Sequence, residues 1–92
     1  LTEANLWATR LSGAGLKWAR LRLENLEGAN LWAANLSATD LKESNLERAD
    51  LTHANLTKAN LKDAKGFNTS DTTGAIFCRT IMPDGTKNNS GF

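Results

Sequence analysis

Residues 27–64 read EGANLWAANLSATDLKESNLERADLTHANLTKANLKDA, and a leucine stands at every fifth position of this stretch. The spacing continues toward the N-terminus, so that thirteen leucines follow one another at five-residue intervals from Leu1 to Leu61. An amphipathic helix repeats near 3.6 residues and a strand near 2, so neither element accounts for a period of five. The chain is therefore an internal repeat, and its fold has to be derived from the repeating unit.

The repeating unit has three restricted positions and two free ones. A small residue lies two positions before nearly every leucine, and asparagine or aspartate dominates one position before it. The two positions after the leucine vary freely. If the chain turns a corner every five residues, the small residue and the leucine both face inward. The small residue then lets the walls approach, and the leucine fills the interior.

This unit, A-(N/D)-L-x-x, resembles the pentapeptide-repeat family, and the likeness covers residues 1–64. The resemblance implies an all-β solenoid, a right-handed quadrilateral β-helix of about four coils with four five-residue sides per coil. Residues twenty positions apart would then stack directly. The stretch GAIFCRTIMPDG (74–85) is similar to the ends of such proteins from cyanobacteria.

The repeat divides the chain into three parts. Residues 1–64 are regular repeats, and residues 65–84 are degenerate repeats that form a last coil after a one-residue bulge near Lys65 and Gly66. Residues 85–92 form a polar tail that follows a turn. The expected core consists of the residues at the centres of the repeats: Leu6, Leu11, Leu16, Leu21, Leu26, Leu31, Leu36, Leu41, Leu46, Leu51, Leu56, Leu61, Phe67, Phe77 and Met82.

Charge and hydropathy exclude two classes of partner. The sequence has eleven basic and ten acidic residues. This net charge of +1 does not indicate the basic surface that nucleic-acid binding requires. No apolar run approaches the length needed to span a bilayer, so no membrane partner is expected. The chain begins at Leu1 rather than Met, which favours a fragment or a processed product. Its compartment is open: cytoplasmic, or periplasmic or thylakoid-lumenal if a leader was removed.

The reactive side chains are too few to build a catalytic site. The sequence has one histidine, His53, and one cysteine, Cys78. We expect both to point outward, on different sides of different coils. A single histidine and a single cysteine cannot form a zinc site, and no glycine-rich phosphate loop is present. We therefore predict no catalytic residue, no metal ligand and no cofactor, and expect a protein that is not an enzyme.

Glu24 is the irregular inward site of the repeat. It occupies the position two before a leucine, where the other repeats carry a small residue. Burial of an unpaired carboxylate is costly. Either the wall bulges and the Glu24 side chain reaches solvent, or Glu24 is buried with hydrogen-bond partners. We favour a local irregularity over a ligand site.

The tryptophans fall on the free positions and are expected outside. Tryptophan is enriched at binding hot spots. The candidate interface combines the three indoles with nearby apolar and basic residues: Trp7, Trp18, Trp32, Leu23, Arg20 and Arg22. The alternative is that the rings simply lie along the wall over neighbouring side chains.

These observations favour a non-enzymatic structural and protein-interaction module that presents flat arrays of side chains. The expected partner is a protein, with end-to-end self-association as a second option. The family suggests an alternative, because some members interact with topoisomerases by imitating DNA. That role needs long, strongly anionic sides, and the short length and near-neutral charge of this chain disfavour it.

Overall fold

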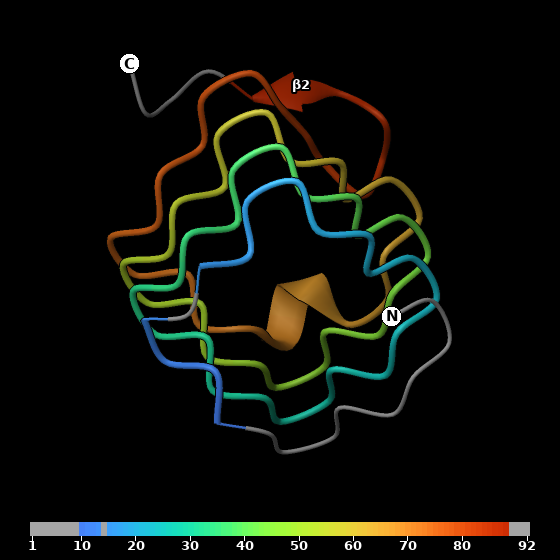
Figure 1. The fold of residues 1–92 in the computed structure, drawn as a ribbon. Coiled ribbons are helices and arrows are strands. Elements are labelled where there is room, and N and C mark those ends of the chain that lie inside the picture. Colours follow the sequence, from blue (N-terminus) through green and yellow to red (C-terminus); the bar gives the residue numbers. More distant parts are fainter. Residues whose placement is uncertain (1–9, 14, 89–92) are drawn as a thin grey trace.

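The computed structural model describes residues 10–13 and 15–88 of the 92. These residues wind into stacked coils whose outline is roughly square when viewed along the stack (Figure 1). Parallel bridges join residues twenty positions apart, as between Asn30 and Asp50 and between Asn35 and Asn55. Because one side takes five residues, an offset of twenty corresponds to four sides per coil.

Backbone hydrogen bonds join each coil to the next. The N–H of Leu31 donates to the carbonyl of Asp50 at 2.8 Å, and the N–H of Ala33 donates to the carbonyl of Thr52 at 2.8 Å. The N–H of Asp50 donates in the opposite direction, to the carbonyl of Ala29, at 2.9 Å. The same three bonds recur along the stack, so the backbone polar groups of the middle coils are satisfied without long strands.

A tight turn makes each corner of the coil. The N–H of Ala34 donates to the carbonyl of Leu31 at 3.0 Å, and Ala33, the third residue of this turn, has φ 56°. A positive φ at the third turn residue is the pattern of a type II turn. It recurs at every fifth residue from Gly13 to Asp63, mostly at residues that are not glycine. The leucine interval is thus the interval between corners.

Regular elements are short in the described part of the chain. They are the 3₁₀ helix η1 (Phe67–Thr69) and the strands β1 (Thr80–Ile81) and β2 (Lys87–Asn88). β1 and β2 are antiparallel, with Thr80 opposite Asn88 and Ile81 opposite Lys87. We expected β-structure on every side, but the coils pair through isolated bridges because a turn interrupts each side after two or three extended residues.

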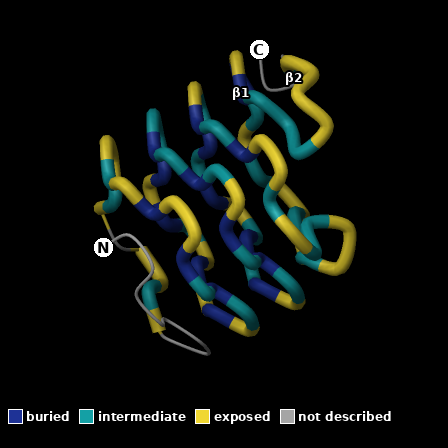
Figure 2. Tube along the Cα trace, turned by 90° about the vertical axis from the view of Figure 1, so that its right-hand side faces the viewer, coloured by how far each residue is buried: buried dark blue, intermediate teal, exposed yellow. Residues whose placement is uncertain are grey.

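The interior is a column of leucines faced by alanines. Every leucine of the five-residue series from Leu21 to Leu61 is fully buried, and Ala29, Ala34, Ala54 and Ala59 are buried with them. Figure 2 shows these buried positions recurring from coil to coil. Half-buried residues pack against both ends of this column: Leu11 and Leu16 at one end, and Phe67, Phe77 and Met82 at the other. Leu6 lies outside the described residues.

The asparagine or aspartate before each leucine stabilises the corner. The Oδ1 atom of Asn45 accepts the N–H of Glu47 at 3.0 Å, and the Oδ1 atom of Asp50 accepts the N–H of Thr52 at 3.0 Å. This bond to the backbone two residues later is an Asx turn. It also forms at Asn25, Asn30, Asn35, Asp40, Asn55, Asn60, Asp71 and Asp84. The amide or carboxylate therefore supplies an acceptor that leucine or alanine could not.

The pairing offset changes by one residue near the C-terminus. Asn45 pairs with Lys65, twenty residues on, whereas Asp50 pairs with Asp71, twenty-one residues on. Gly66 lies between them with φ 71°, and η1 follows it. A Cβ atom on Gly66 would come within 2.6 Å of the Cα atom of Glu47, so only glycine fits here.

Candidate functional site

The four sides of the coils form four outer walls, and each is named here after one of its residues. The residues that compose them follow from the twenty- and twenty-one-residue offsets. The walls are the Trp32 wall (10–13, 29–33, 49–53, 70–74), the Trp18 wall (15–18, 34–38, 54–58, 75–79), the Leu23 wall (19–23, 39–43, 59–63, 80–84) and the Arg48 wall (24–28, 44–48, 64–69).

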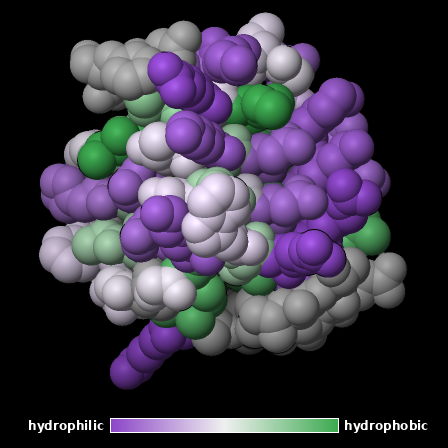
Figure 3. All heavy atoms as spheres, turned by 45° about the horizontal axis from the view of Figure 1, so that its top comes forward, coloured by the Kyte–Doolittle hydropathy of each residue, from purple (hydrophilic) through white to green (hydrophobic). Residues whose placement is uncertain are grey.

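The candidate interface residues are distributed over three walls. Trp18 is 71% exposed, Trp32 47% and Leu23 42%. Arg20 and Arg22 are exposed on the Leu23 wall, and Trp7 lies outside the described residues. The structure therefore does not bring the predicted set together into one patch. Figure 3 shows a face of the molecule on which hydrophilic residues predominate and hydrophobic ones form separate small groups.

The Trp18 wall contains a shallow groove of about 210 Å³ beside the exposed indole. Lys17 and Lys58 provide its cations, Trp18 and Ala38 its apolar surface, and Ser37 and Thr57 its hydroxyl groups; Asn55 also lines it. The Nζ atom of Lys17 lies 5.8 Å from the centre of the Trp18 ring. This distance is within the range of a cation–π contact. The groove thus combines positive charge, an aromatic surface and hydrogen-bonding groups.

The tryptophan of the Trp32 wall, unlike Trp18, packs against another ring. The rings of Trp32 and His53 meet edge to face, with centroids 5.8 Å apart and planes at 88°. The imidazole also lies over Gly74 of the following coil, where an added Cβ atom would come within 2.4 Å of Nδ1. Trp32 is thus partly covered by a neighbour on its own wall, which is the arrangement we considered as the alternative to an interface.

Ion pairs balance the charges of the other two walls. On the Arg48 wall, Arg48 Nη2 lies 2.6 Å from Glu27 Oε2. On the Leu23 wall, Arg22 Nη2 lies 3.6 Å from Asp40 Oδ2. Exposed pairs of this kind contribute about 0–1 kcal/mol to stability. Their main effect here is to leave little uncompensated charge on either wall.

Glu24 is fully buried inside the stack. Its Oε1 and Oε2 atoms have no hydrogen-bond partner, nor does the Oγ atom of Ser44, the residue at the equivalent position of the next coil. The backbone stays regular, since the N–H of Glu24 reaches the carbonyl of Leu21 at 3.1 Å and its carbonyl accepts the N–H of Asn45 at 2.9 Å. The wall does not bulge, and the hydrogen bonds expected for a buried Glu24 are not formed. Such a group destabilises the fold.

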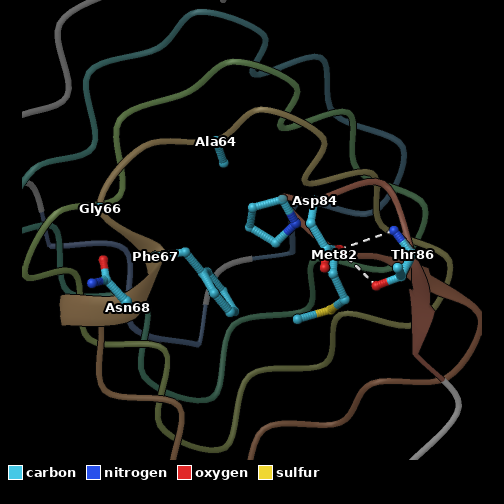
Figure 4. A pocket seen from close by; sticks show the side chains of 8 residues that line it. Ala64, Gly66, Phe67, Asn68, Met82, Asp84 and Thr86 are labelled. Atoms are coloured by element: carbon cyan, nitrogen blue, oxygen red, sulfur yellow. Dashed lines mark hydrogen bonds between the residues drawn. The ribbon is translucent and has the colours of Figure 1, made fainter.

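A depression of about 440 Å³ lies at the C-terminal end of the leucine column. Ala64, Phe67, Met82 and Pro83 form its apolar lining, with Asn68, Asp84 and Thr86 at its polar edge (Figure 4). The Oδ1 atom of Asp84 accepts both the N–H and the hydroxyl of Thr86, at 3.0 and 2.6 Å. The Thr86 hydroxyl and the Asp84 carboxylate thus bond to each other at the edge of a mainly apolar surface at the end of the core.

The two reactive side chains of the sequence lie apart. His53 belongs to the Trp32 wall and Cys78 to the Trp18 wall. Cys78 is only 8% exposed, so the expectation that it points outward was wrong. Its position directly follows a repeat centre, and Lys42, Glu47, Thr52 and Thr57 at the same position are also only half-exposed. A short side chain that leaves the corner there stays against the wall. Within the described residues, no group of three potential metal ligands occurs.

Two Asx turns change the acidity of their carboxyl groups. The N–H of Thr73 and then its hydroxyl hold the pKa of Asp71 below its ordinary value. The hydroxyl of Thr86 and then its N–H do the same for the pKa of Asp84. In both cases hydrogen bonds favour the ionised form. Both carboxylates are exposed and hold the geometry of the corner.

The sequence and the coiled backbone both resemble those of known proteins. A family model described as pentapeptide repeats, with eight copies, matches residues 25–63. The crystal structure of alr5209, a pentapeptide repeat protein from Nostoc Pcc 7120, superposes with a TM-score of 0.86. It is 31% identical over 98% of this chain and 74% of its own chain. The chain belongs to the pentapeptide-repeat family.

Other solved pentapeptide-repeat proteins are less similar in shape. HetL from Nostoc sp. strain PCC 7120, described as involved in heterocyst differentiation regulation, gives 33% identity and a TM-score of 0.45, covering 95% of this chain and 43% of its own. Rfr23 from Cyanothece 51142 gives 34% identity and a TM-score of 0.37, covering 82% and 54%. The chain thus spans less than two-thirds of either protein. The comparison with curated proteins gave no match.

Family membership supports a structural role. Pentapeptide-repeat proteins are generally repeat modules rather than enzymes. The expected cyanobacterial likeness agrees with the source of the similar structure alr5209, Nostoc Pcc 7120. Among the described residues, no helix has the length and apolar character needed to cross a bilayer.

The sequence reasoning missed the groove residues of this pentapeptide-repeat chain: Ser37, Thr57, Asn55, Ala38 and Lys58. Ser37, Ala38, Thr57 and Lys58 stand at the variable positions of the repeat, and Asn55 stands at the asparagine position before a leucine. The signal was present in the twenty-residue spacing, which aligns Lys17 with Ser37 and Thr57, and Trp18 with Ala38 and Lys58. Counting charge along each wall separately, rather than over the whole chain, would have found it.

Proposed function

We propose that this chain is a non-enzymatic protein-interaction module, a right-handed quadrilateral β-helix that binds through the side chains of its outer walls. The observation that carries the proposal is the exposure of Trp18 beside the groove on a wall held by backbone bonds. Both coil-to-coil bonds around it are formed, from Leu16 N to Asn35 O at 2.8 Å and from Trp18 N to Ser37 O at 3.0 Å. An aromatic side chain on such a support loses little conformational freedom on binding, which favours affinity.

The proposal that the protein is not an enzyme rests on the separation of its reactive groups. His53 and Cys78 occupy different walls, and His53 contacts Trp32. Neither the groove nor the C-terminal depression is lined by histidine or cysteine, and the Thr86 hydroxyl of the depression is bonded to Asp84 within an Asx turn. A turnover that is lost on His53→Ala would contradict this part of the proposal.

The second candidate function is that of a DNA mimic that acts on a topoisomerase. Such a surface needs rows of uncompensated carboxylates. On the described walls, however, Glu27, Glu47, Asp40 and Asp63 all lie within ion-pair distance of a basic side chain. The net charge of +1 also disfavours this role. A DNA gyrase supercoiling assay with the protein in large excess should show no inhibition, and inhibition would favour the mimic instead.

The second partner that we propose to test is another copy of this chain, stacked end to end. β2 pairs with β1 along the edge where a further coil would bond to Thr80 and Ile81. A strand that occupies this edge hinders a second copy from continuing the stack there. Any self-association should therefore use the other end of the stack, and should leave the pairing of β1 and β2 intact.

The proposed function can be tested by selection from a displayed library of random peptides of about twelve residues. The immobilised protein should enrich a defined set of sequences. The Trp18→Ala, Leu23→Ala and Trp32→Ala variants, each checked for an unchanged circular dichroism spectrum, then identify the wall that binds. Enrichment that depends on at least one of these residues supports an interaction module. Absence of any enriched sequence would contradict it.

A further inference from the structure

The Trp18 wall differs from the other three in its charge. It carries Lys17, Lys58 and Arg79, and it has no aspartate or glutamate in residues 15–18, 34–38, 54–58 or 75–79. Each of the other walls includes acidic residues; the Leu23 wall has Asp40, Glu43, Asp63 and Asp84 beside its cations. A net charge near zero thus conceals one wall with a single sign of charge, which attracts anionic groups.

The lysines of this wall are not engaged by the protein itself. Within the part of the chain that the structure describes, neither Lys17 nor Lys58 has a carboxylate within ion-pair distance. The ammonium group of Lys17 lies over the face of Trp18, and both lysines line the groove. This contrasts with Arg22, Arg48 and Lys62, which all have acidic neighbours. The two ammonium groups are therefore available to an external anion.

The size and shape of the groove suit a peptide rather than a small molecule. Its volume of about 210 Å³ is below the roughly 300–1,000 Å³ typical of small-molecule sites. It spans three coils, and coils at β spacing of about 4.8 Å place the Lys17 and Lys58 corners about 10 Å apart. An extended peptide advances about 3.3 Å per residue and alternates its side chains between two faces, so acidic residues about two or four positions apart share a face, span about 7–13 Å and would reach both lysines.

The same wall offers apolar anchors. Trp18 stands at one end of it and Ile76, 41% exposed, belongs to the last coil. The Ser37 and Thr57 hydroxyls donate to Asn35 Oδ1 at 2.7 Å and Asn55 Oδ1 at 2.6 Å, so their oxygen lone pairs remain to accept backbone N–H groups. An apolar side chain of the partner would pack on the indole while its acidic residues meet the lysines.

We infer that the Trp18 wall is the docking surface for an acidic protein segment that carries a large apolar side chain, an inference that rests on the proposed interaction function. Nucleic acid is the less suitable polyanion. Duplex binders that depend on phosphate contacts commonly make about 6–10 of them, and this wall has three cations. The apolar surface beside the cations further favours a peptide with mixed acidic and apolar character.

The test uses the peptides enriched by selection on the full chain, synthesised with a fluorescein label. Their sequences should be rich in Asp and Glu around a Leu, Ile, Phe or Trp residue. Lys17→Glu/Lys58→Glu should lower their affinity at least about tenfold at about 50 mM salt and less at about 300 mM salt, because the contacts are partly exposed to solvent. The matched control is Lys42→Glu/Lys62→Glu, which makes the same charge change on the Leu23 wall and should alter affinity less than about twofold.

The outcomes distinguish failure of the docking surface on the Trp18 wall from failure of the proposed interaction function. The peptides could lose affinity for Lys42→Glu/Lys62→Glu or for Trp32→Ala while they still bind Lys17→Glu/Lys58→Glu. That result would overturn this inference and leave the proposed interaction function standing. Enriched peptides without acidic residues would do the same. Failure to enrich any peptide contradicts both. Fluorescein-labelled oligo(dT) could bind more tightly than the peptides and lose this binding in Lys17→Glu/Lys58→Glu. That result would identify single-stranded nucleic acid, rather than a protein segment, as the ligand of the Trp18 wall.

Discussion

His53 lies edge-on to Trp32, with ring centroids 5.8 Å apart, although the two residues are on successive coils and twenty-one positions apart in the sequence. The contact depends on the absence of a side chain at Gly74, over which the imidazole lies. His53 and Gly74 thus stack in one column of the Trp32 wall, and the indole of Trp32 meets the imidazole from the neighbouring column of the preceding coil.

This column predicts the effect of Gly74→Ala. Gly13 and Gly74 have nearly the same φ, 69° and 70°, but a Cβ atom on Gly13 meets nothing within 4 Å. Both substitutions should cost about 1 kcal/mol because alanine disfavours positive φ. Gly74→Ala should cost about 0.5–1.5 kcal/mol more, because it displaces His53 from Trp32. Urea denaturation measures both. Adding His53→Ala should abolish the excess, and an equal cost for the two glycines would show that His53 moves aside freely.

Glu24 predicts a substitution that stabilises the protein. Glu24→Met keeps a similar volume and removes a buried carboxylate that has no hydrogen-bond partner. The free energy of unfolding should rise by about 1–3 kcal/mol, the cost of leaving such a group unsatisfied. The measurement is thermal or urea denaturation, with Glu43→Met on an exposed corner as a control that gives no comparable gain. A marked destabilisation by Glu24→Met would mean that the carboxylate binds something.

The leucine column predicts a gradient of mutational cost along the stack. Leu41 is fully buried in a middle coil, and Leu41→Ala should cost about 2–5 kcal/mol. Leu16 is half-buried at the end of the described core, so Leu16→Ala removes less buried area and should cost less. Comparable losses at both sites would indicate that the first described coil is as enclosed as the middle ones.

The Asx turn at Asp71 predicts a pH dependence. The N–H and the hydroxyl of Thr73 lower the pKa of Asp71 from its ordinary value of 3.8. A lowered pKa in the folded state means that the ionised carboxylate contributes stability above pH 3.8, and that this contribution is lost as the pH falls through the lowered value. The difference in Tm between the wild type and Asp71→Asn should therefore shrink on acidification. A difference that is independent of pH would show that the carboxylate charge plays no part in the corner.

The repeat made much of the fold predictable, because period and geometry are linked. A leucine that recurs every five residues must meet the same corner geometry each time, which accounts for the burial of Leu21 to Leu61. Asparagine and aspartate readily bond to the backbone two residues later, and such bonds are formed at Asn45 and its equivalents.

The outer surface was less predictable, because the period does not specify the contacts of the side chains. The same free positions carry Trp18, which is exposed, and Cys78, which is buried. Whether a cation on a wall is neutralised depends on the conformations of long side chains on adjacent coils, as for Arg48 and Glu27. Glu24 shows another limit, since the sequence left open whether its side chain bulges outward or is buried with partners, and the packing buries it without a partner for its oxygens.

The central claim is that the protein binds through the Trp18 wall, and mapping of amide chemical shifts by NMR tests it most directly. On titration with the tightest selected peptide, the amides of Trp18, Ala38 and Lys58 should shift, and the Trp18 indole N–H should shift with them. The amides of Leu23, Glu43 and Asp63 on the adjacent wall should stay in place. Shifts concentrated on the Leu23, Trp32 or Arg48 wall, with Trp18 unchanged, would contradict the account.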